Sequence, residues 1–344
     1  AASLWASDGT VRTLRRRRGN ILGLAFFPLG DRAVTWSTDG AAVIWNTTTG
    51  GEILELTHDA SVLNAKVFAG GDLVLTLDGT GMATVWRAAD ATRVATFRLP
   101  EVSDADAVPG GRNVVAAGWD YSFIWHSSGG TRCDLATSLQ GMWVAMFPDG
   151  ERVFVVGAEH ERMWTGSIWN AGNCALIHRL GEAWWPAAIS TSGDLVAAAV
   201  VQGIAIWNTH SGCLLRIVPR SVHAGDEDDD TLAIGFLPQT DLVVAMTSQV
   251  AATFDPRTGE EVMSSRSRRG WFQRLAVSPA GDVFATCGPQ QTVLWDARSG
   301  APLRSWNVSR RGHVEYCRVA VGVGRALGPR EFGSGASARL ALTA

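Results

Sequence analysis

The sequence predicts an all-β chain made of repeated four-stranded antiparallel sheets. An aromatic residue closes a short alternating run at intervals of 40, 41, 39, 44, 38, 47 and 41 residues. These aromatic residues are Trp5, Trp45, Trp86, Trp125, Trp169, Trp207, Phe254 and Trp295. A period near 40 residues with four short strands in each unit is typical of a propeller blade. We therefore expect residues 1–344 to form a single β-propeller domain.

The first complete unit illustrates the four strands expected in every blade. It reads NILGLAFFP, RAVTWS, AVIW and EILEL, with turns at Gly30-Asp31, at Thr38-Asp39-Gly40 and in a Thr-Thr-Gly-Gly stretch. Later units repeat these turns as PDGER, SPAGDVF, NTHSG, DPRTGE and DARSG. Short runs of β-branched and apolar residues between Gly, Asp and Asn turns are what antiparallel meanders require.

Both ends of the chain carry strands that no complete unit uses. Seven complete units run from about residue 20 to residue 306. The N-terminus adds SLW and TVRTL within about residues 1–14, and the C-terminus adds HVEYCRVAV and ARLALTA within 313–344. We expect these pieces to form an eighth blade, because their pairing removes the exposed edges of an open ring. The alternative is a seven-bladed ring with one end of the chain outside it.

The repeats resemble the WD-repeat family. The matching segments are VLWDARSG at 293–300, the Gly312-His313 pair and VSPAGDVFATCG at 277–288. Blades of that family carry a hydrogen-bonded Asp six residues before the Trp. Here that spacing occurs only as Asp39 before Trp45, with Ser37 on the preceding strand and Asn20 in place of the usual His. We expect the other blades to depend on packing of Trp, Val and Ile between sheets.

Charge and composition narrow the classes of partner. Apolar residues make up 46% of the chain and charged residues 18%, enough for a large core. The formal net charge of −3 excludes a generally basic nucleic-acid binder. RNA remains possible only through local basic patches, and a protein or peptide is the expected partner.

The cysteines and the apolar runs suggest a compartment. The five cysteines are odd in number and include no CxxC pair, so we expect neither a metal site nor a disulfide framework. A reducing environment fits this pattern. No apolar run reaches about 18 residues, and the first ten residues lack a signal-peptide pattern. We expect an intracellular, cytoplasmic protein that has no contact with a membrane.

Three consecutive loops between blades are rich in arginine. Strands alternate in direction, so loops between blades and loops between the second and third strands of a blade emerge on one face, here called the top face. The arginines of these loops are Arg15, Arg16, Arg17 and Arg18, then Arg266, Arg268 and Arg269, then Arg310 and Arg311. Guanidinium groups pair strongly with carboxylates and phosphates. The sequence therefore predicts a basic sector for an acidic or phosphorylated partner, unless the loops are charged only because they are solvated.

Several tryptophans lie outside the closing position of the third strand and map to the top face. They are Trp119, Trp143, Trp164, Trp184, Trp185 and Trp271. Exposed Trp supplies a large contact area at low entropy cost and is common among interface anchors. The alternative is that these side chains plug the central channel or cover neighbouring blades. We expect Trp119, Trp143, Trp164, Trp185 and Trp271 to divide, with at least two accessible.

Catalytic patterns are weak by comparison. GxSxG and GxxxxGK[ST] are absent, and Glu159-His160-Glu161 has no second ligand cluster beside it. A quinone-dependent dehydrogenase would need a periodic docking Trp, which only DARSGAPLRSW approaches, with the wrong spacing. We expect no enzyme and no cofactor. The sequence predicts a non-enzymatic interaction scaffold; a constitutive subunit of a large protein or ribonucleoprotein assembly is the alternative, and a quinoprotein-like dehydrogenase a remote one.

Overall fold

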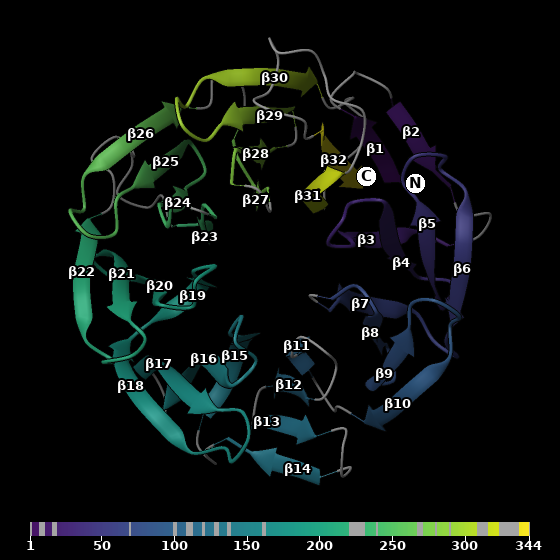
Figure 1. Cartoon of the computed structure of the whole chain (residues 1–344), viewed down its shortest axis with the longest axis horizontal. Helices are drawn as coiled ribbons and strands as arrows, with labels where there is room; N and C mark the ends of the chain where they lie inside the picture. The colour runs from purple at the N-terminus through teal and green to yellow at the C-terminus, as the bar shows by residue number, and fades with distance from the viewer. Residues whose placement is uncertain are drawn as a thin grey trace. The chain divides into compact units, whose positions relative to one another are not determined.

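A computed structural model describes most of the chain as β-strands joined by short turns (Figure 1). The described residues are 2–6, 11–15, 19–68, 70–98, 102–107, 113–118, 121–126, 131–135, 139–159, 163–219, 231–238, 240–266, 271–278, 281–288, 290–307, 316–322 and 337–343. Within these ranges, no helix has the length and apolar character needed to cross a membrane.

The strands form eight four-stranded sheets, seven of which use four consecutive strands. Contacts divide the chain into two compact units. Unit 1 comprises residues 1–99, 276–295 and 302–344, and unit 2 comprises residues 100–275 and 296–301.

Unit 1 holds the terminal sheet and sheets 1, 2 and 7. The terminal sheet consists of β1 (Ala2–Ala6), β2 (Val11–Leu14), β31 (Tyr316–Gly322) and β32 (Ser337–Thr343). Sheet 1 consists of β3 (Ile21–Phe26), β4 (Arg32–Ser37), β5 (Ala41–Asn46) and β6 (Glu52–Thr57). Sheet 2 consists of β7 (Val62–Val67), β8 (Leu73–Asp78), β9 (Met82–Arg87) and β10 (Arg93–Arg98). Sheet 7 consists of β27 (Arg274–Val277), β28 (Val283–Cys287), β29 (Gln291–Asp296) and β30 (Pro302–Asn307).

Unit 2 holds sheets 3 to 6. Sheet 3 consists of β11 (Val102–Ala107), β12 (Asn113–Gly118), β13 (Tyr121–His126) and β14 (Thr131–Asp134). Sheet 4 consists of β15 (Leu139–Met146), β16 (Arg152–Glu159), β17 (Met163–Asn170) and β18 (Leu176–Glu182). Sheet 5 consists of β19 (Trp184–Ile189), β20 (Leu195–Val200), β21 (Gly203–Asn208) and β22 (Leu214–Pro219). Sheet 6 consists of β23 (Ala233–Phe236), β24 (Val243–Met246), β25 (Val250–Phe254) and β26 (Glu261–Arg266).

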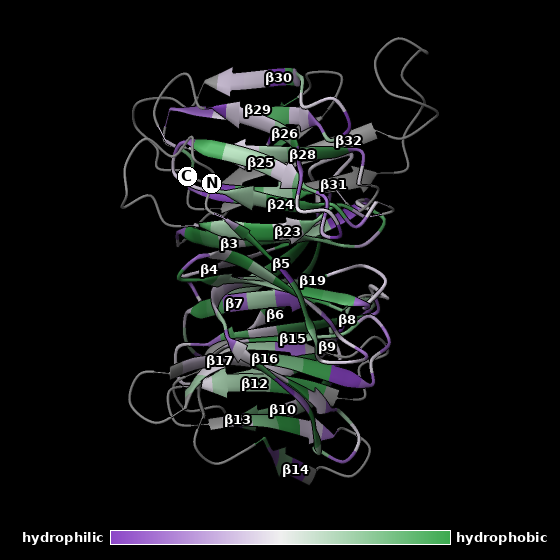
Figure 2. Cartoon of the chain, turned by 90° about the vertical axis from the view of Figure 1, so that its left-hand side faces the viewer, coloured by the Kyte–Doolittle hydropathy of each residue, from purple (hydrophilic) through white to green (hydrophobic). Residues whose placement is uncertain are grey.

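The hydrophobic cores lie between neighbouring sheets. The second and third strands are buried on both faces, as in β4 and β5, whereas the fourth strand exposes most of its residues. Phe154 and Ile168 of sheet 4 pack with Val196 and Trp207 of sheet 5, and similar clusters join sheet 3 to sheet 4 and sheet 5 to sheet 6. Figure 2 shows the hydrophobic colouring of the buried strand β25. Sheets that pack in this way are the blades of an all-β propeller, as the sequence predicts.

The two ends of the chain complete one sheet. β1 pairs with β2 on one side and with β32 on the other, and β32 pairs with β31. β31 also contacts β3 of sheet 1 and β28 of sheet 7, and Ala2, Leu4 and Leu14 are buried against sheet 1. The predicted pairing of the termini is confirmed. The closure of all the sheets into a single ring of eight blades stays a prediction.

A buried indole on the third strand is hydrogen-bonded to a hydroxyl group in the same sheet. Trp45 Nε1 donates to Thr35 Oγ1 at 2.8 Å in sheet 1, and Trp86 Nε1 donates to Thr76 Oγ1 at 2.7 Å in sheet 2. In sheet 4 Trp169 Nε1 donates to Ser167 Oγ, and in sheet 7 Trp295 Nε1 donates to Thr286 Oγ1, each at 2.8 Å. The indole N–H would be costly to bury without an acceptor.

Sheet 2 contains a polar network that the sequence analysis missed. His58 Nδ1 lies 3.5 Å from Asp78 Oδ2, and both side chains are buried. The other carboxylate oxygen of Asp78 accepts hydrogen bonds from the backbone N–H groups of Thr80 and Met82. The expectation that this blade depends on packing alone is therefore wrong. Asn20, expected in place of a buried His in sheet 1, is exposed.

The expectation that the cysteines form no disulfide is also wrong. Cys133 on β14 and Cys174 in the turn between β17 and β18 form a disulfide, with their Cα atoms 6.3 Å apart. Cys287 is disulfide-bonded as well. Cys133 and Cys174 are 41 residues apart in sequence but lie on adjacent blades. Their bond removes the argument for a reducing compartment.

Removal of residues 1–14 should provoke aggregation. The deletion takes away β1 and β2 and exposes the edge of β32 that pairs with β1, and an exposed strand edge favours pairing with another chain. Light scattering should show large particles in the truncated protein and none in the intact one. A Val11→Ala variant, which changes an exposed side chain of β2, is the control. A truncated chain that remains monomeric would contradict the pairing.

The His58–Asp78 pair should make stability depend on pH. Burial lowers the pKa of His58 below its ordinary 6.5, against the attraction of Asp78. Burial would raise the pKa of Asp78, but hydrogen bonds from Thr80 and Met82 hold it below 3.8. Near pH 6.5 the unfolded chain therefore takes up a proton at His58 that the folded protein resists.

The free energy of unfolding should consequently fall as the pH falls from 8 to 5. Asp78 stays ionised throughout this window, so His58 supplies the local change. Urea denaturation of the wild type and of His58→Gln measures the effect. An equal loss of stability in both proteins would show that His58 does not carry it.

Candidate functional site

Trp185 lies in a bulge at the start of β19. Trp184 pairs with Ala199 and Ala187 pairs with Ala198, so Trp185 and Pro186 are two extra residues on β19. The Trp185–Pro186 peptide bond is cis, and Trp185 is 55% exposed. Bulges commonly redirect a side chain away from the sheet. In this sheet the bulge presents an indole to solvent.

Trp184 is fixed beside Trp185 by two kinds of contact. Its ring stacks on that of Trp164 at the start of β17, with ring centroids 6.1 Å apart and an angle of 29° between the planes. Its Nε1 donates to Glu182 Oε1 at 2.9 Å, and the same oxygen accepts from the backbone N–H of Val201 at 3.2 Å. Glu182 therefore ties the loop between sheets 4 and 5 to the turn between β20 and β21.

Trp143 and Trp164 belong partly to the core of unit 2. Trp143 follows a one-residue bulge on β15, where it pairs with Val156. Its ring makes an edge contact with Phe154 at 5.7 Å, and both tryptophans are partly buried against the core between sheets 4 and 5. Trp143 and Trp164 therefore fit the alternative interpretation, in which some of the predicted tryptophans cover neighbouring blades.

Trp271 is the second accessible indole of the predicted set. It lies between sheets 6 and 7, within unit 2, and is 52% exposed. The next residue, Phe272, is buried, and its N–H donates to the carbonyl of Ser248 in the turn between β24 and β25. That bond holds the loop against sheet 6. Trp185 and Trp271 are thus two accessible members of the predicted five, and their location on the top face stays a prediction.

The arginine loops are described only in part. Arg15 follows β2 in unit 1 and Arg266 ends β26 in unit 2, and both are exposed. The other predicted residues lie outside the described residues: Arg16, Arg17, Arg18, Arg268, Arg269, Arg310, Arg311 and Trp119. His160 and Glu161 of the Glu159-His160-Glu161 stretch also lie outside the described residues. The shared basic sector therefore stays a prediction.

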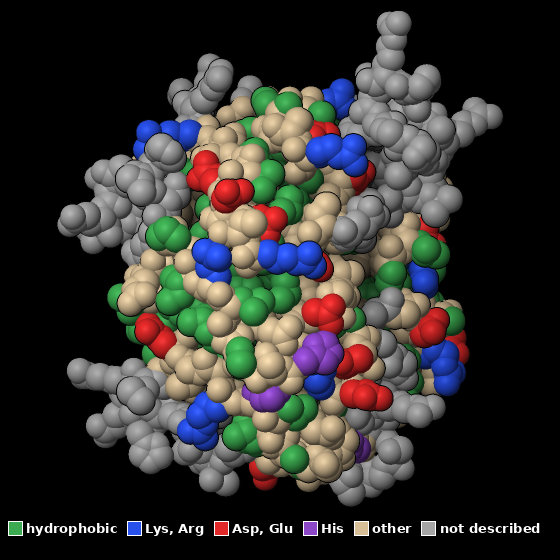
Figure 3. Space-filling view, turned by 60° about the vertical axis from the view of Figure 1, so that its left-hand side comes forward, with side chains coloured by type: hydrophobic (Ala, Val, Ile, Leu, Met, Phe, Trp, Pro, Cys, Tyr) green, Lys and Arg blue, Asp and Glu red, His purple; other side chains and the backbone are tan. Residues whose placement is uncertain are grey.

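The outer strands of unit 2 expose a row of apolar side chains that the sequence analysis did not single out. The row consists of Leu176 and Ile177 on β18, Leu214 and Leu215 on β22, and Val262 on β26. Figure 3 shows hydrophobic side chains on this face among charged ones. The sequence signal is apolar residues at the first or second position of successive fourth strands.

Comparisons with known proteins support the fold. The computationally designed Ika8 protein has a TM-score of 0.68 to this chain at 17% identity, covering 94% of this chain and 97% of its own. The chain has the β-propeller fold. The Cps50 (Swd1) β-propeller domain of Myceliophteria thermophila matches with a TM-score of 0.59 at 17% identity, over 86% of this chain and 99% of its own. No protein-family model and no curated protein matches the sequence.

The difference between partly buried and accessible tryptophans should appear in the free energy of unfolding of the variants. Trp143→Ala removes a partly buried ring that packs on Phe154 and should lower the free energy of unfolding by about 3 kcal/mol. Trp185→Ala removes a mostly exposed ring and should cost less than about 1 kcal/mol. Urea denaturation followed by circular dichroism measures both. Equal losses would show that Trp185 also supports the core.

Proposed function

We propose that this chain is a non-enzymatic interaction scaffold that binds a peptide or protein partner on its top face. The supporting observation is the pair of exposed indoles, Trp185 and Trp271, both within unit 2. Trp185 lies near the start of a first strand and Trp271 shortly before one, so we expect both to emerge on the same side of that unit. Trp is enriched among the residues that contribute most to the binding energy of protein interfaces.

The surroundings of Trp185 suit a binding anchor. Trp184 is already fixed by its stack on Trp164 and by its hydrogen bond to Glu182. A side chain that is ordered before binding loses little entropy when the partner docks. Val201, 65% exposed in the turn that Glu182 holds, adds apolar surface next to this loop. The group resembles the aromatic centre of an interface with polar residues at its rim.

The arginine loops suggest the chemistry of the partner. Arg15 and Arg266 are exposed, and the sequence places seven more arginines in the same three loops. Guanidinium groups form strong paired hydrogen bonds with carboxylates and phosphates. We therefore expect the partner to be acidic or phosphorylated.

Capture of partners by the immobilised full chain tests the proposal. Quantitative mass spectrometry compares proteins retained by the wild type, by Trp185→Ala and by Trp271→Ala. The captured partner should bind at least one Trp variant more weakly by about 2 kcal/mol or more, while the fold remains intact. Leu214→Ala is the matched control, because Leu214 is similarly exposed but lies on the outer strand β22.

The salt dependence of binding tests the expected charge of the partner. Replacement of Arg15 and Arg266 by Ser should weaken binding at low salt and flatten its dependence on ionic strength. A partner lost from Leu214→Ala but retained by both Trp variants would contradict the proposed top-face site and place the interface on the outer strands.

A further inference from the structure

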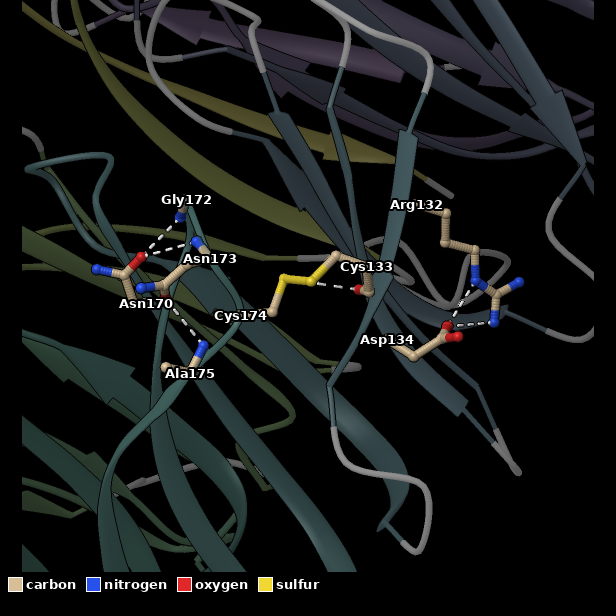
Figure 4. Close-up of a disulfide and its surroundings, with 8 residues drawn as sticks. All are labelled: Arg132, Cys133, Asp134, Asn170, Gly172, Asn173, Cys174 and Ala175. Carbon is tan, nitrogen blue, oxygen red and sulfur yellow. Dashed lines mark hydrogen bonds and ion pairs between the residues drawn. A yellow bond between two sulfur atoms is a disulfide. The ribbon is translucent and has the colours of Figure 1, made fainter.

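Three potential metal ligands converge at the boundary of sheets 3 and 4. Cys133 lies on β14, Cys174 lies in the turn after β17, and His126 ends β13. One ligand atom from each residue lies within 4.8 Å of the other two, and all three side chains are half-buried. Among the described residues this is the group of His, Cys, Asp and Glu side chains that could hold a metal ion. Figure 4 shows the disulfide, which joins β14 to the turn between β17 and β18.

Cys174 occupies a backbone position that four other blades give to glycine. Its φ is 56°, in the left-handed region that side chains with a Cβ rarely adopt. The turns between the third and fourth strands of sheets 1, 5, 6 and 7 place Gly50, Gly212, Gly259 and Gly300 there, with φ between 67° and 75°. Sheet 2 places Ala91 there with a φ of 58°, so a side chain can be accommodated at this position. In sheet 4 the side chain is a thiol, which adds a potential metal ligand to the turn.

The surroundings hold the ligands without adding an opposing charge. Asn170 Oδ1 accepts hydrogen bonds from the N–H groups of Gly172 and Asn173, which fixes the turn that carries Cys174. The nearby Arg132 is paired with Asp134 at 2.6 Å (Figure 4). Its guanidinium group also lies over the ring of Phe123. The positive charge of Arg132 is therefore compensated and does not oppose a bound cation.

We propose that reduction of the Cys133–Cys174 disulfide creates a zinc site formed by both thiolates and the His126 imidazole. A thiol reductant supplies two electrons and is itself oxidised to a disulfide, and the two sulfur atoms take up two protons. Zn²⁺ then displaces those two protons when the thiolates bind. Oxidised, the two cysteines link sheets 3 and 4 covalently; reduced, they link the same sheets through the metal.

The donor set and its spacing fit zinc. Thiolate and imidazole are the usual zinc ligands, and donors around a tetrahedral ion lie roughly 3.3–3.8 Å apart for bonds of about 2.0–2.3 Å. Side-chain rotations can bring three atoms within 4.8 Å of one another to that spacing. Three protein ligands leave the fourth position to water, the arrangement of exchangeable rather than closed structural sites.

Cobalt absorption tests the site on the full chain. Protein treated with a thiol-free phosphine reductant should bind one equivalent of Co²⁺ at this site, with thiolate-to-cobalt charge-transfer absorption and tetrahedral visible bands. Added Zn²⁺ should remove both signals. The oxidised protein should show neither. Zn²⁺ should also raise the melting temperature of the reduced protein, because a ligand that binds only the folded state stabilises it.

Variants separate this site from the other thiols. Cys174→Gly restores the residue found in the matching turns and should reduce Co²⁺ affinity at least tenfold without loss of fold. His126→Ala should also weaken binding at least tenfold, while Cys213→Ser, which removes an exposed thiol, should change nothing. Cys287 remains in every variant, so its reduction cannot explain a loss. No charge-transfer band, an equal band in Cys174→Gly, or unfolding on reduction would overturn the proposal.

Discussion

The buried indole on the third strand constrains the geometry of each blade that carries it. Its apolar area fills the space between sheets, but its N–H needs an acceptor in the same interior. Trp45 and Trp86 each find one in a threonine ten residues earlier, on the second strand. That bond spans a hairpin of fixed length, so the turn between the two strands must be short and in register. A buried N–H left without its acceptor would cost about 1–3 kcal/mol.

This constraint explains why the fold could be predicted from the sequence. Aromatic residues at a period near 40 mark the third strands, and the leftover strands at both ends can be satisfied only by pairing with each other. The polar network in sheet 2 was not predicted, because Asp78 lies eight residues before Trp86 rather than six. Hydrogen bonds from the following turn hold its carboxylate in place, which a spacing rule does not anticipate.

The candidate site could be predicted less well, because exposure depends on local register. Trp143 and Trp185 both lie on a first strand, yet Trp143 follows a one-residue bulge and Trp185 lies inside a two-residue bulge. The sequence pattern does not show how many residues a bulge holds. The contact of Cys133 with Cys174 was equally hidden, since 41 residues separate them and only the packing of adjacent blades brings them together.

The sheet built from both ends of the chain sets the order in which the molecule can fold. β1 cannot pair with β32 until residues 337–343 have been synthesised, whereas sheets 1 to 7 contain only consecutive strands. Contacts between distant parts of a chain form slowly, because closing a long loop costs entropy before any pairing rewards it. During translation the hairpin of β1 and β2 therefore has an unpaired edge on β1 until β32 is synthesised. Chaperone binding to a nascent chain would be most useful at this hairpin.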